Sequence, residues 1–482
     1  MVRDLKDILD QARNFAARRR YVDALKSLRN SLTSSYRGEQ WRDVALFLMQ
    51  LGDVDAALAA TRNFTESCPN DVGAHSLLAN VLADVGELEE SIQIATEVAD
   101  TLPDNWGAYY NLGIYHLRDG ALDDAKTAFE SVLKLEPNHV LSLEYLSSLA
   151  DSVSSPKWLK EVERCERLDG LDQNSQAALQ YAKANLLGRL ERHEEAFAAY
   201  HAGADIMQQI SGTDMSLVTQ HVEELRQGFS DGFFQRHRSN QYENNKPIFI
   251  VGVPRSGTTL VEGILAAHSE VTPGGETKLL RLACAKYNGF STSDIRQLEG
   301  DISEGSNPWE ELGSELQRLQ TQRIGSAGRM TEKNLGHHFF LGAISLLAAG
   351  ARIVYCTRDQ NATAWSCFKT RFSSGNGWSN DFDSIREYQN HYAQLMEHWF
   401  AVLPAGSIYE VCYEDLIAAP DREIHGVLNH VGLSFEDACL SPHLSGMPVA
   451  TASVRQVRQP IYREANQNFQ NYAELFWNKL DV

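Results

Sequence analysis

Prolines and glycines recur at a fixed period in the first third of the chain. The repeating positions, each 34 residues from the last of its kind, are Pro69, Pro103, Pro137, Gly52, Gly86 and Gly120. A period of this length is typical of stacked helix pairs. The glycine then lies in the turn between two helices, and the proline ends the second helix. We therefore expect an N-terminal all-α solenoid.

The repeat resembles the tetratricopeptide repeat (TPR), because Trp41 and Tyr109 fall at its early aromatic position. Residues 5–33 resemble a degenerate opening unit, and residues 177–210 a further divergent unit. We expect the TPR domain to span residues 1–212. TPR solenoids commonly bind a peptide or partner segment in a concave groove. The repeats could bind a partner in this groove, or they could be a scaffold packed on a second domain. Both roles stay open, because a fold does not imply a function.

A second feature lies at residues 247–259, where four apolar residues precede a loop bounded by Gly252 and Gly257. Apolar residues at helical spacing follow the loop. Strand, loop and helix in this order form a phosphate cradle, since backbone N–H groups and the positive end of the helix face the anion. Thr258 stands where the lysine of a nucleoside-triphosphatase loop belongs, and Arg255 supplies a cation from within the loop. The loop therefore favours a phosphorylated nucleotide without metal-assisted γ-phosphoryl transfer.

Further apolar runs predict strands that alternate with helices, and Lys333, Arg358 and Tyr413 each come just after one of them. This order predicts a P-loop-like α/β domain with a mainly parallel sheet flanked by helices. The carboxyl ends of parallel strands meet at one edge of a sheet, where ligands bind. We expect these three side chains and Arg255 to gather there.

Length and composition bound the remaining possibilities. A chain of 482 residues predicts about two to four domains. We place a connecting helix and linker at 213–245 and the α/β domain at 246–482. The net charge of −20 argues against general binding to nucleic acids or anionic membranes. No segment predicts a membrane span or a signal peptide, and seven scattered cysteines suggest reduced thiols, so we expect a cytoplasmic protein.

The loop Val253–Thr259 resembles the 5′-phosphosulfate loop of sulfotransferases, closest to the tyrosylprotein sulfotransferase branch. As a whole, the chain resembles a bacterial TPR-containing sulfotransferase. The resemblance implies 3′-phosphoadenosine 5′-phosphosulfate (PAPS) as co-substrate, 3′,5′-adenosine bisphosphate as product, and no metal. It implies that the 5′-phosphosulfate is bound by the loop residues Arg255, Ser256, Gly257, Thr258 and Thr259.

Glu276 lies in a Gly-Glu pattern that resembles the family's catalytic base. A carboxylate can accept the proton of an acceptor hydroxyl as the new bond forms. The alternative is that Glu276 caps the following helix. His337 and His338 are alternative bases. Lys333 resembles the lysine that meets the bridging oxygen of the phosphosulfate, where a cation stabilises developing charge, although a solvated surface lysine is the alternative.

Arg358 and Ser366 resemble the pair that binds the nucleotide's 3′-phosphate, unless Arg358 forms only a surface salt bridge. Tyr413 resembles the tyrosine near the adenine, or is an aromatic core residue. The family often adds a basic residue four positions after the serine, where this chain has Thr370 with Arg371 beside it. The third phosphate contact is therefore open.

Two further segments carry predictions, one near the C-terminus and one in the middle of the α/β half. The C-terminal stretch 451–462 resembles a family signature, which places Ser453 at the leaving 5′-phosphate and adds Arg458 to the nucleotide contacts. Residues 288–327 are polar and weakly periodic. We expect them to form a mobile covering insertion with one short helix from Trp309 to Leu319.

The predicted function is the transfer of a sulfuryl group from PAPS to a hydroxyl or amine. The acceptor is open among a peptide or protein, a carbohydrate and a small molecule. One alternative is a P-loop kinase or nucleotide hydrolase. The other is a non-catalytic TPR adaptor with a nucleotide-binding remnant.

Overall fold

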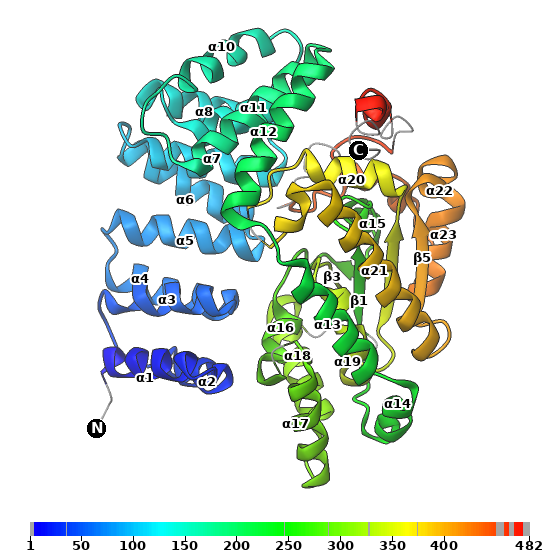
Figure 1. Cartoon of the computed structure of the whole chain (residues 1–482). Coiled ribbons are helices and arrows are strands. Elements are labelled where there is room, and N and C mark those ends of the chain that lie inside the picture. Colours follow the sequence, from blue (N-terminus) through cyan, green and yellow to red (C-terminus); the bar gives the residue numbers. More distant parts are fainter. Residues whose placement is uncertain are drawn as a thin grey trace.

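The structure, a computed structural model, describes residues 4–34, 36–244, 246–287, 289–325, 328–373, 375–449, 457–461 and 467–475. Its first half is an arc of antiparallel helix pairs (Figure 1). The helices are α1 (Leu5–Ala17), α2 (Tyr21–Ser31), α3 (Gln40–Leu51), α4 (Val54–Ser67), α5 (Val72–Val85), α6 (Leu88–Thr101), α7 (Trp106–Asp119), α8 (Leu122–Leu135), α9 (Val140–Leu149), α10 (Ser155–Cys165), α11 (Gln173–Arg189) and α12 (His193–Ser211).

The periodic glycines have the predicted role in this arc. Gly52, Gly86 and Gly120 end α3, α5 and α7 in the left-handed conformation, with φ of 92°, 94° and 91°. Glycine adopts this conformation without the steric cost that other residues meet. Gly113 lets two helices of one repeat approach closely, since a Cβ there would lie 2.7 Å from the Phe129 ring. The expected solenoid is confirmed.

The second half is built on a five-stranded parallel sheet with the order β2-β3-β1-β4-β5. The strands are β1 (Pro247–Gly252), β2 (Val271–Thr272), β3 (Arg329–Glu332), β4 (Arg352–Thr357) and β5 (Ile408–Cys412). Its helices, after the connecting helices α13 (Met215–Gly228) and α14 (Asp231–His237), are α15 (Thr258–Ala266), α16 (Leu279–Ala283), α17 (Thr292–Ser303), α18 (Pro308–Ile324), α19 (Leu341–Leu347), α20 (Gln360–Phe368), α21 (Phe382–Val402), α22 (Tyr413–Ala418), α23 (Pro420–Val431) and α25 (Gln467–Gln470).

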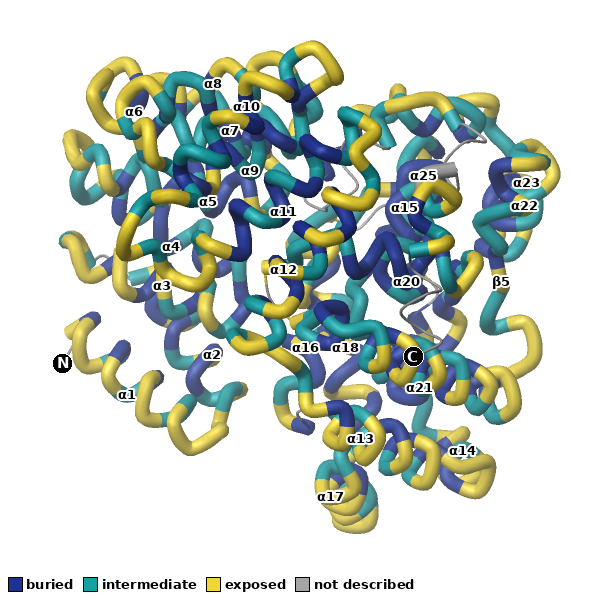
Figure 2. Tube along the Cα trace, turned by 45° about the horizontal axis from the view of Figure 1, so that its top comes forward, coloured by how far each residue is buried: buried dark blue, intermediate teal, exposed yellow. Residues whose placement is uncertain are grey.

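The central strand β1 has an apolar core on each face. Its six residues are all buried, because successive side chains of a strand point to opposite faces and helices cover both. Phe249 and Val251 join the core that includes α19, α20 and α21. Ile248 and Ile250 join the core that includes α15 and α23. The predicted parallel sheet flanked by helices is confirmed, and Figure 2 shows α15 and α20 as largely buried.

The expectation of one short helix within residues 288–327 is wrong, and the mobility of this segment stays a prediction. The segment forms two helices, α17 and α18, and α18 extends well beyond the expected Trp309–Leu319. Trp309, Leu312, Leu316 and Leu319 are buried along one face of α18. They recur at helical spacing, so they form an apolar stripe against the core. Polar residues on the other face of α18 make the segment polar on average, so its composition does not reveal the apolar stripe.

The TPR arc contacts the second half through the turns of successive repeats. Lys278 lies against Gly52, Arg323 donates to the carbonyl of Val85 at 3.2 Å, and Arg458 donates to the carbonyl of Asp119 at 2.9 Å. Each contact lies at the C-terminal end of the first helix of a repeat, where the helix dipole is negative. Three repeats thus present the same end to a basic residue of the second half: two receive a hydrogen bond from an arginine, and the third lies against the aliphatic stem of Lys278. We call these contacts the turn seam.

The seam continues beyond the turns. Arg323 also forms a two-hydrogen-bond ion pair with Asp55, at 2.7 and 3.0 Å. Arg371 is paired with Glu144 of α9, with its Nε 2.7 Å from the carboxylate. Buried residues from the repeats and from the α/β half belong to one continuous core. The arc is therefore packed on the second half, as a scaffold would be. The limits predicted from the sequence, residue 212 for the end of the TPR domain and residue 246 for the start of the α/β domain, stay predictions.

Candidate active site

The loop between β1 and α15 is held in a tight conformation. Gly257 has φ of 101° and Arg255 has φ of 73°, a left-handed value that is uncommon outside glycine. A Cβ at Gly252 would lie 2.7 Å from the carbonyl oxygen of Cys356, and one at Gly257 would lie 2.8 Å from the Tyr413 ring. The loop therefore needs both glycines, and it delivers the N-terminus of α15 to the carboxyl edge of the sheet. The predicted order of strand, loop and helix is thus present, and anion binding by this loop stays a prediction.

Arg255, Arg358, Ser366 and Tyr413 come together beside this loop. The Nε of Arg255 lies 3.1 Å from the hydroxyl of Ser366, and Arg358 donates to the carbonyl of Arg255 at 3.1 Å. The guanidinium of Arg358 lies over the Tyr413 ring, 4.8 Å from its centroid. The edge therefore gathers two arginines, a hydroxyl and an aromatic face from four different segments. A planar guanidinium recognises phosphate oxygens well.

Lys369 belongs to the same cluster and was missed by the sequence analysis. It follows Ser366 by three residues, at the end of α20. Burial, and the positive charges of Arg255, Arg358 and Arg189, lower the pKa of Lys369 to about 8. A cation among cations marks a place where an anion would be stabilised. Arg371, the basic residue beside the position that the motif spacing predicts, forms an ion pair with Glu144 instead.

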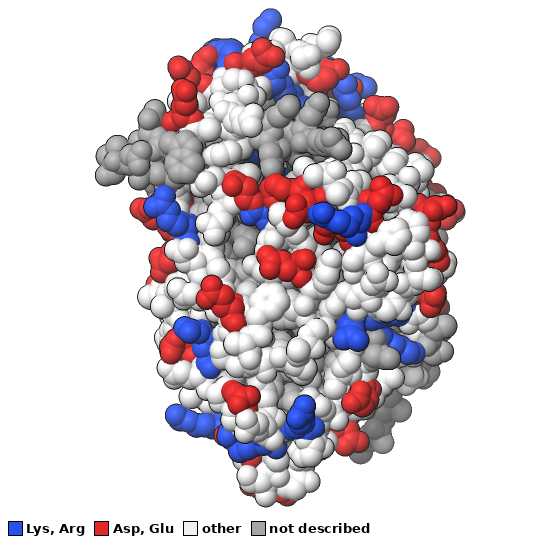
Figure 3. All heavy atoms as spheres, turned by 90° about the vertical axis from the view of Figure 1, so that its right-hand side faces the viewer, with Lys and Arg blue, Asp and Glu red and all other residues white. Residues whose placement is uncertain are grey.

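This cationic cluster is local on an acidic body. The chain has a net charge of −20. On the face formed by β5, α22 and α23, acidic side chains are interspersed with basic ones (Figure 3). The positive charge at the sheet edge is therefore a property of the site rather than of the whole surface.

Lys333 and Glu276 form an ion pair next to the loop. The Lys333 ammonium lies 3.2 Å from Glu276 Oε1 and 3.5 Å from the hydroxyl of Thr259. Lys333 is buried, with 1% of its surface exposed, so the alternative of a solvated surface lysine is wrong. Glu276 is open to solvent, with 39% of its side chain exposed. Lys278 rather than Glu276 stands at the N-cap of α16, so the capping alternative is wrong as well.

The two histidines are poorly placed to act as bases. His337 and His338 are buried, and burial lowers the pKa of each to about 3. His338 stacks on Tyr392 with ring centroids 4.1 Å apart, and His337 lies against Phe249. An imidazole with so low a pKa is a weak proton acceptor. Of the candidate bases, Glu276 is the one that reaches solvent beside the loop.

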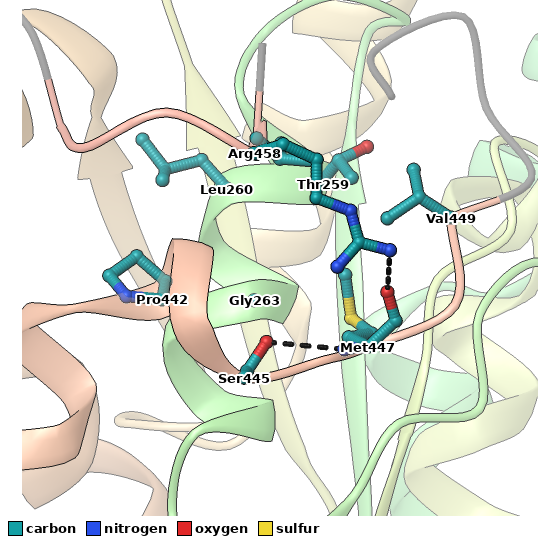
Figure 4. Close-up of a pocket in the computed structure, with 9 residues that line it drawn as sticks. Thr259, Leu260, Gly263, Pro442, Ser445, Met447, Val449 and Arg458 are labelled. Atoms are coloured by element: carbon teal, nitrogen blue, oxygen red, sulfur yellow. Dashed lines mark hydrogen bonds between the residues drawn. The ribbon is translucent and has the colours of Figure 1, made fainter. Parts of the chain in front are cut away.

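The C-terminal candidates differ in their outcome. Ser453 lies outside the described residues. Arg458 donates to the carbonyl of Met447 at 2.8 Å, as well as to Asp119 across the turn seam. It lines a small pocket over α15 with Thr259, Leu260 and Met447 among others (Figure 4). Arg458 thus lies near the start of α15, and its contact with a nucleotide stays a prediction.

The described part of the chain contains neither a candidate metal site nor a candidate membrane span. Within it, no group of three or more His, Cys, Asp or Glu residues is arranged to hold a metal ion. Within the same residues, no helix has the length and apolar character needed to cross a membrane.

Comparison with known proteins shows which families parts of this chain are similar to. Residues 247–437 match the model of the sulfotransferase family, and residues 106–139 match that of the tetratricopeptide repeat. This part of the chain is therefore similar to the sulfotransferase family. The match begins at β1 and runs past β5 and α23, so it includes the sheet edge with the phosphate loop, Lys333 and Arg358.

Proteins similar to this chain occur in bacteria and animals. An uncharacterized protein of Aquifex aeolicus is 23% identical over 414 residues, which are 84% of this chain and 54% of that protein. Protein-tyrosine sulfotransferase 2 of Gallus gallus is 26% identical over 241 residues, 48% of this chain and 64% of that protein. This chain thus spans less than two thirds of either relative. A solved sulfotransferase domain from the Synechococcus PCC 7002 olefin synthase aligns with a TM-score of 0.36 and 17% identity, covering 50% of this chain and 96% of that one.

Proposed function

We propose that the chain transfers a sulfuryl group from PAPS to a hydroxyl or amine acceptor. The observation that carries the proposal is the Lys333–Glu276 ion pair at 3.2 Å, beside Thr259 of the phosphate loop. It places a buried cation and a solvent-facing carboxylate at one end of an anion cradle. Sulfuryl transfer needs both, a charge for the leaving phosphate and an acceptor for the proton.

In the proposed reaction, the acceptor oxygen or nitrogen forms a bond to sulfur as the bond from sulfur to the 5′-phosphate oxygen breaks. The electron pair of the broken bond stays on the phosphate. Glu276 takes the proton of the acceptor. Arg255, Lys333 and, by resemblance, Ser453 stabilise the charge on the phosphate, which grows as the bond breaks and so favours the transition state.

The cluster on the other side of the loop suits the 3′-phosphate. We assign this group to Arg358 and Ser366, with Lys369 as the third contact that the motif spacing left open. Tyr413, which lies under the Arg358 guanidinium, is assigned to the adenine end. Charge-assisted hydrogen bonds to a phosphate are about twice as strong as neutral ones. The 3′-phosphate is therefore expected to dominate recognition of the nucleotide.

A thermal-shift titration tests the nucleotide assignment. We expect 3′,5′-adenosine bisphosphate to stabilise the protein, by about 2.7 kcal/mol at a hundredfold excess over Kd, and AMP to do so far less. A shift with ATP and magnesium alone would favour the kinase or hydrolase alternative. No shift with any of the three would favour the adaptor alternative.

The acceptor is tested with labelled PAPS. The names of several animal relatives refer to protein tyrosine, so we propose a peptide acceptor first, followed by carbohydrates and small hydroxyl compounds. Binding of the acceptor in the concave groove of the repeats is part of this proposal. Substitution of polar residues on the groove should then raise KM for a peptide without changing kcat. Unchanged KM would leave the repeats with the scaffold role alone.

A further inference from the structure

Glu262 is a buried carboxylate on the helix that follows the phosphate loop. It is the one charged residue in the sequence of α15, and only 2% of its surface is exposed. A buried carboxylate is costly unless hydrogen bonds and an opposite charge compensate it. Its partners therefore show what the fold uses it for.

One oxygen of Glu262 holds the loop that carries Glu276. Glu262 Oε1 accepts from the backbone N–H of Gly275 at 2.8 Å and from the hydroxyl of Thr331 at 3.0 Å. The same Thr331 hydroxyl accepts from the N–H of Gly274 at 3.1 Å. Two successive amides immediately before Glu276 are thus fixed to α15 and β3. The position of Glu276 depends on this carboxylate.

The other oxygen of Glu262 faces Lys333, with Oε2 3.7 Å from the ammonium. Lys333 therefore lies between two carboxylates, the enclosed Glu262 and the exposed Glu276. Cys356 of β4 is a further titratable group whose charge would couple to Lys333. In the proposed reaction Glu276 takes the acceptor's proton and becomes neutral, so it then no longer compensates the charge of Lys333. Glu262 is fixed by its hydrogen bonds and can remain the counter-ion.

We infer that Glu262 is a positioning residue that keeps Lys333 charged and aligned with the phosphate loop while Glu276 serves the acceptor. This inference rests on the proposed function, because it assigns Glu262 through the roles of Lys333 and Glu276. The contacts of Glu262 are with the Gly275 backbone, Thr331 and Lys333, so it would act through these groups. Without its charge, a buried ammonium would tend to lose its proton, since burial disfavours the charged form.

The substitution Glu262→Gln tests the inference, because the amide oxygen can still accept from Gly275 and Thr331 while the charge is lost. We expect the alkaline limb of the kcat–pH profile to move about one to three pH units lower, the effect of removing an opposite charge at this distance. Affinity for the bisphosphate at pH 7 should change less than about threefold. If the alkaline limb of the profile lies at the wild-type pH and kcat equals the wild-type value, the inference is overturned.

Glu436→Gln is the matched control. Glu436 also accepts from a backbone N–H and a hydroxyl, both of Ser269, the N–H at 2.9 Å, but none of its hydrogen bonds or ion pairs involves Lys333. Its limb should stay at the wild-type pH. If Glu262→Gln does not fold, Glu262→Asp keeps the charge and withdraws it by one methylene. It should lower kcat at every pH, and an Asp variant with wild-type kcat would contradict the inference.

A readout independent of activity separates this inference from the proposed function. In protein labelled with ¹³C at lysine Cε, the Lys333 signal is assigned by its loss in Lys333→Arg. It should titrate at lower pH in Glu262→Gln than in the wild type, and equal titration would refute the inference. Wild-type protein that neither binds the bisphosphate nor transfers sulfuryl would refute the proposed function, while the NMR titration still reports on the Glu262–Lys333 coupling.

Discussion

Replacing Lys369 by methionine should have opposite effects on stability and on nucleotide binding. Burial and the positive charges of Arg255, Arg358 and Arg189 lower the pKa of Lys369 from 10.5 to about 8. A lysine whose folded pKa is below its unfolded pKa destabilises the protein while it is protonated, and this cost fades as the pH rises through the two values. At pH 7 Lys369 is mostly charged, so Lys369→Met should raise the unfolding free energy by about 1 to 3 kcal/mol.

Binding should change in the opposite direction. A 3′-phosphate beside Lys369 would return its pKa towards the ordinary value, so the wild type should take up a proton on binding. Linkage then makes the affinity for the bisphosphate fall about tenfold between pH 7 and pH 9. Lys369→Met should bind about ten- to a hundredfold more weakly at pH 7, from the loss of a charged hydrogen bond. Its affinity should also depend less on pH.

Calorimetric titration at the two pH values, with thermal unfolding of the ligand-free proteins, measures both effects. AMP is the control ligand, because it lacks the 3′-phosphate and should show a flatter pH dependence in the wild type. A variant that loses stability as well as affinity would mean that Lys369 has a packing role. Equal pH dependence in the wild type and the variant would remove Lys369 from the phosphate site.

Three further substitutions test the remaining parts of the site. Lys333→Ala should lower single-turnover transfer at least about a hundredfold, since it removes a charge that acts in the transition state, while calorimetry should show bisphosphate affinity within about tenfold. Glu276→Gln should lower kcat by about 10²- to 10⁴-fold through loss of the base, with a melting temperature close to that of the wild type, because Glu262 still faces Lys333. Gly257→Ala should destabilise the protein by about 1 to 3 kcal/mol, because φ is 101° and Tyr413 occupies the space of the new Cβ. Wild-type behaviour of any of these variants would contradict the role assigned to that residue.

Local patterns made the main architecture predictable from sequence. The 34-residue period depends on turn glycines, and the phosphate loop depends on glycine spacing after an apolar run, so both are visible in short stretches. Arg255, Lys333, Arg358 and Tyr413 could be expected to meet because the ends of parallel strands share an edge. Whether Lys333 is a site residue or a solvated surface lysine could not be predicted from composition. Its burial in the structure excludes the surface alternative.

Other parts of the site depend on distant pairings that no local pattern reports. Glu262 is a single charge in an apolar helix, and its role follows only from contacts with Thr331 and Lys333, about seventy residues away. Lys369 lies one position from where the motif spacing places a basic residue, and only the packing of α20 reveals its cationic neighbours. Arg371 is committed to Glu144, 227 residues earlier in the chain.

The turn seam has a consequence for how this chain can evolve. Repeat arrays usually tolerate the gain or loss of a whole unit, because each unit contacts only its neighbours. Here the turns at Gly52, Gly86 and Gly120 each meet a different side chain of the second half of the chain. The spacing of the repeats thus matches the spacing of their contacts on the second half of the chain. An inserted or deleted 34-residue unit would put every following turn opposite the wrong partner, so the number of repeats should be as constrained as the active site itself.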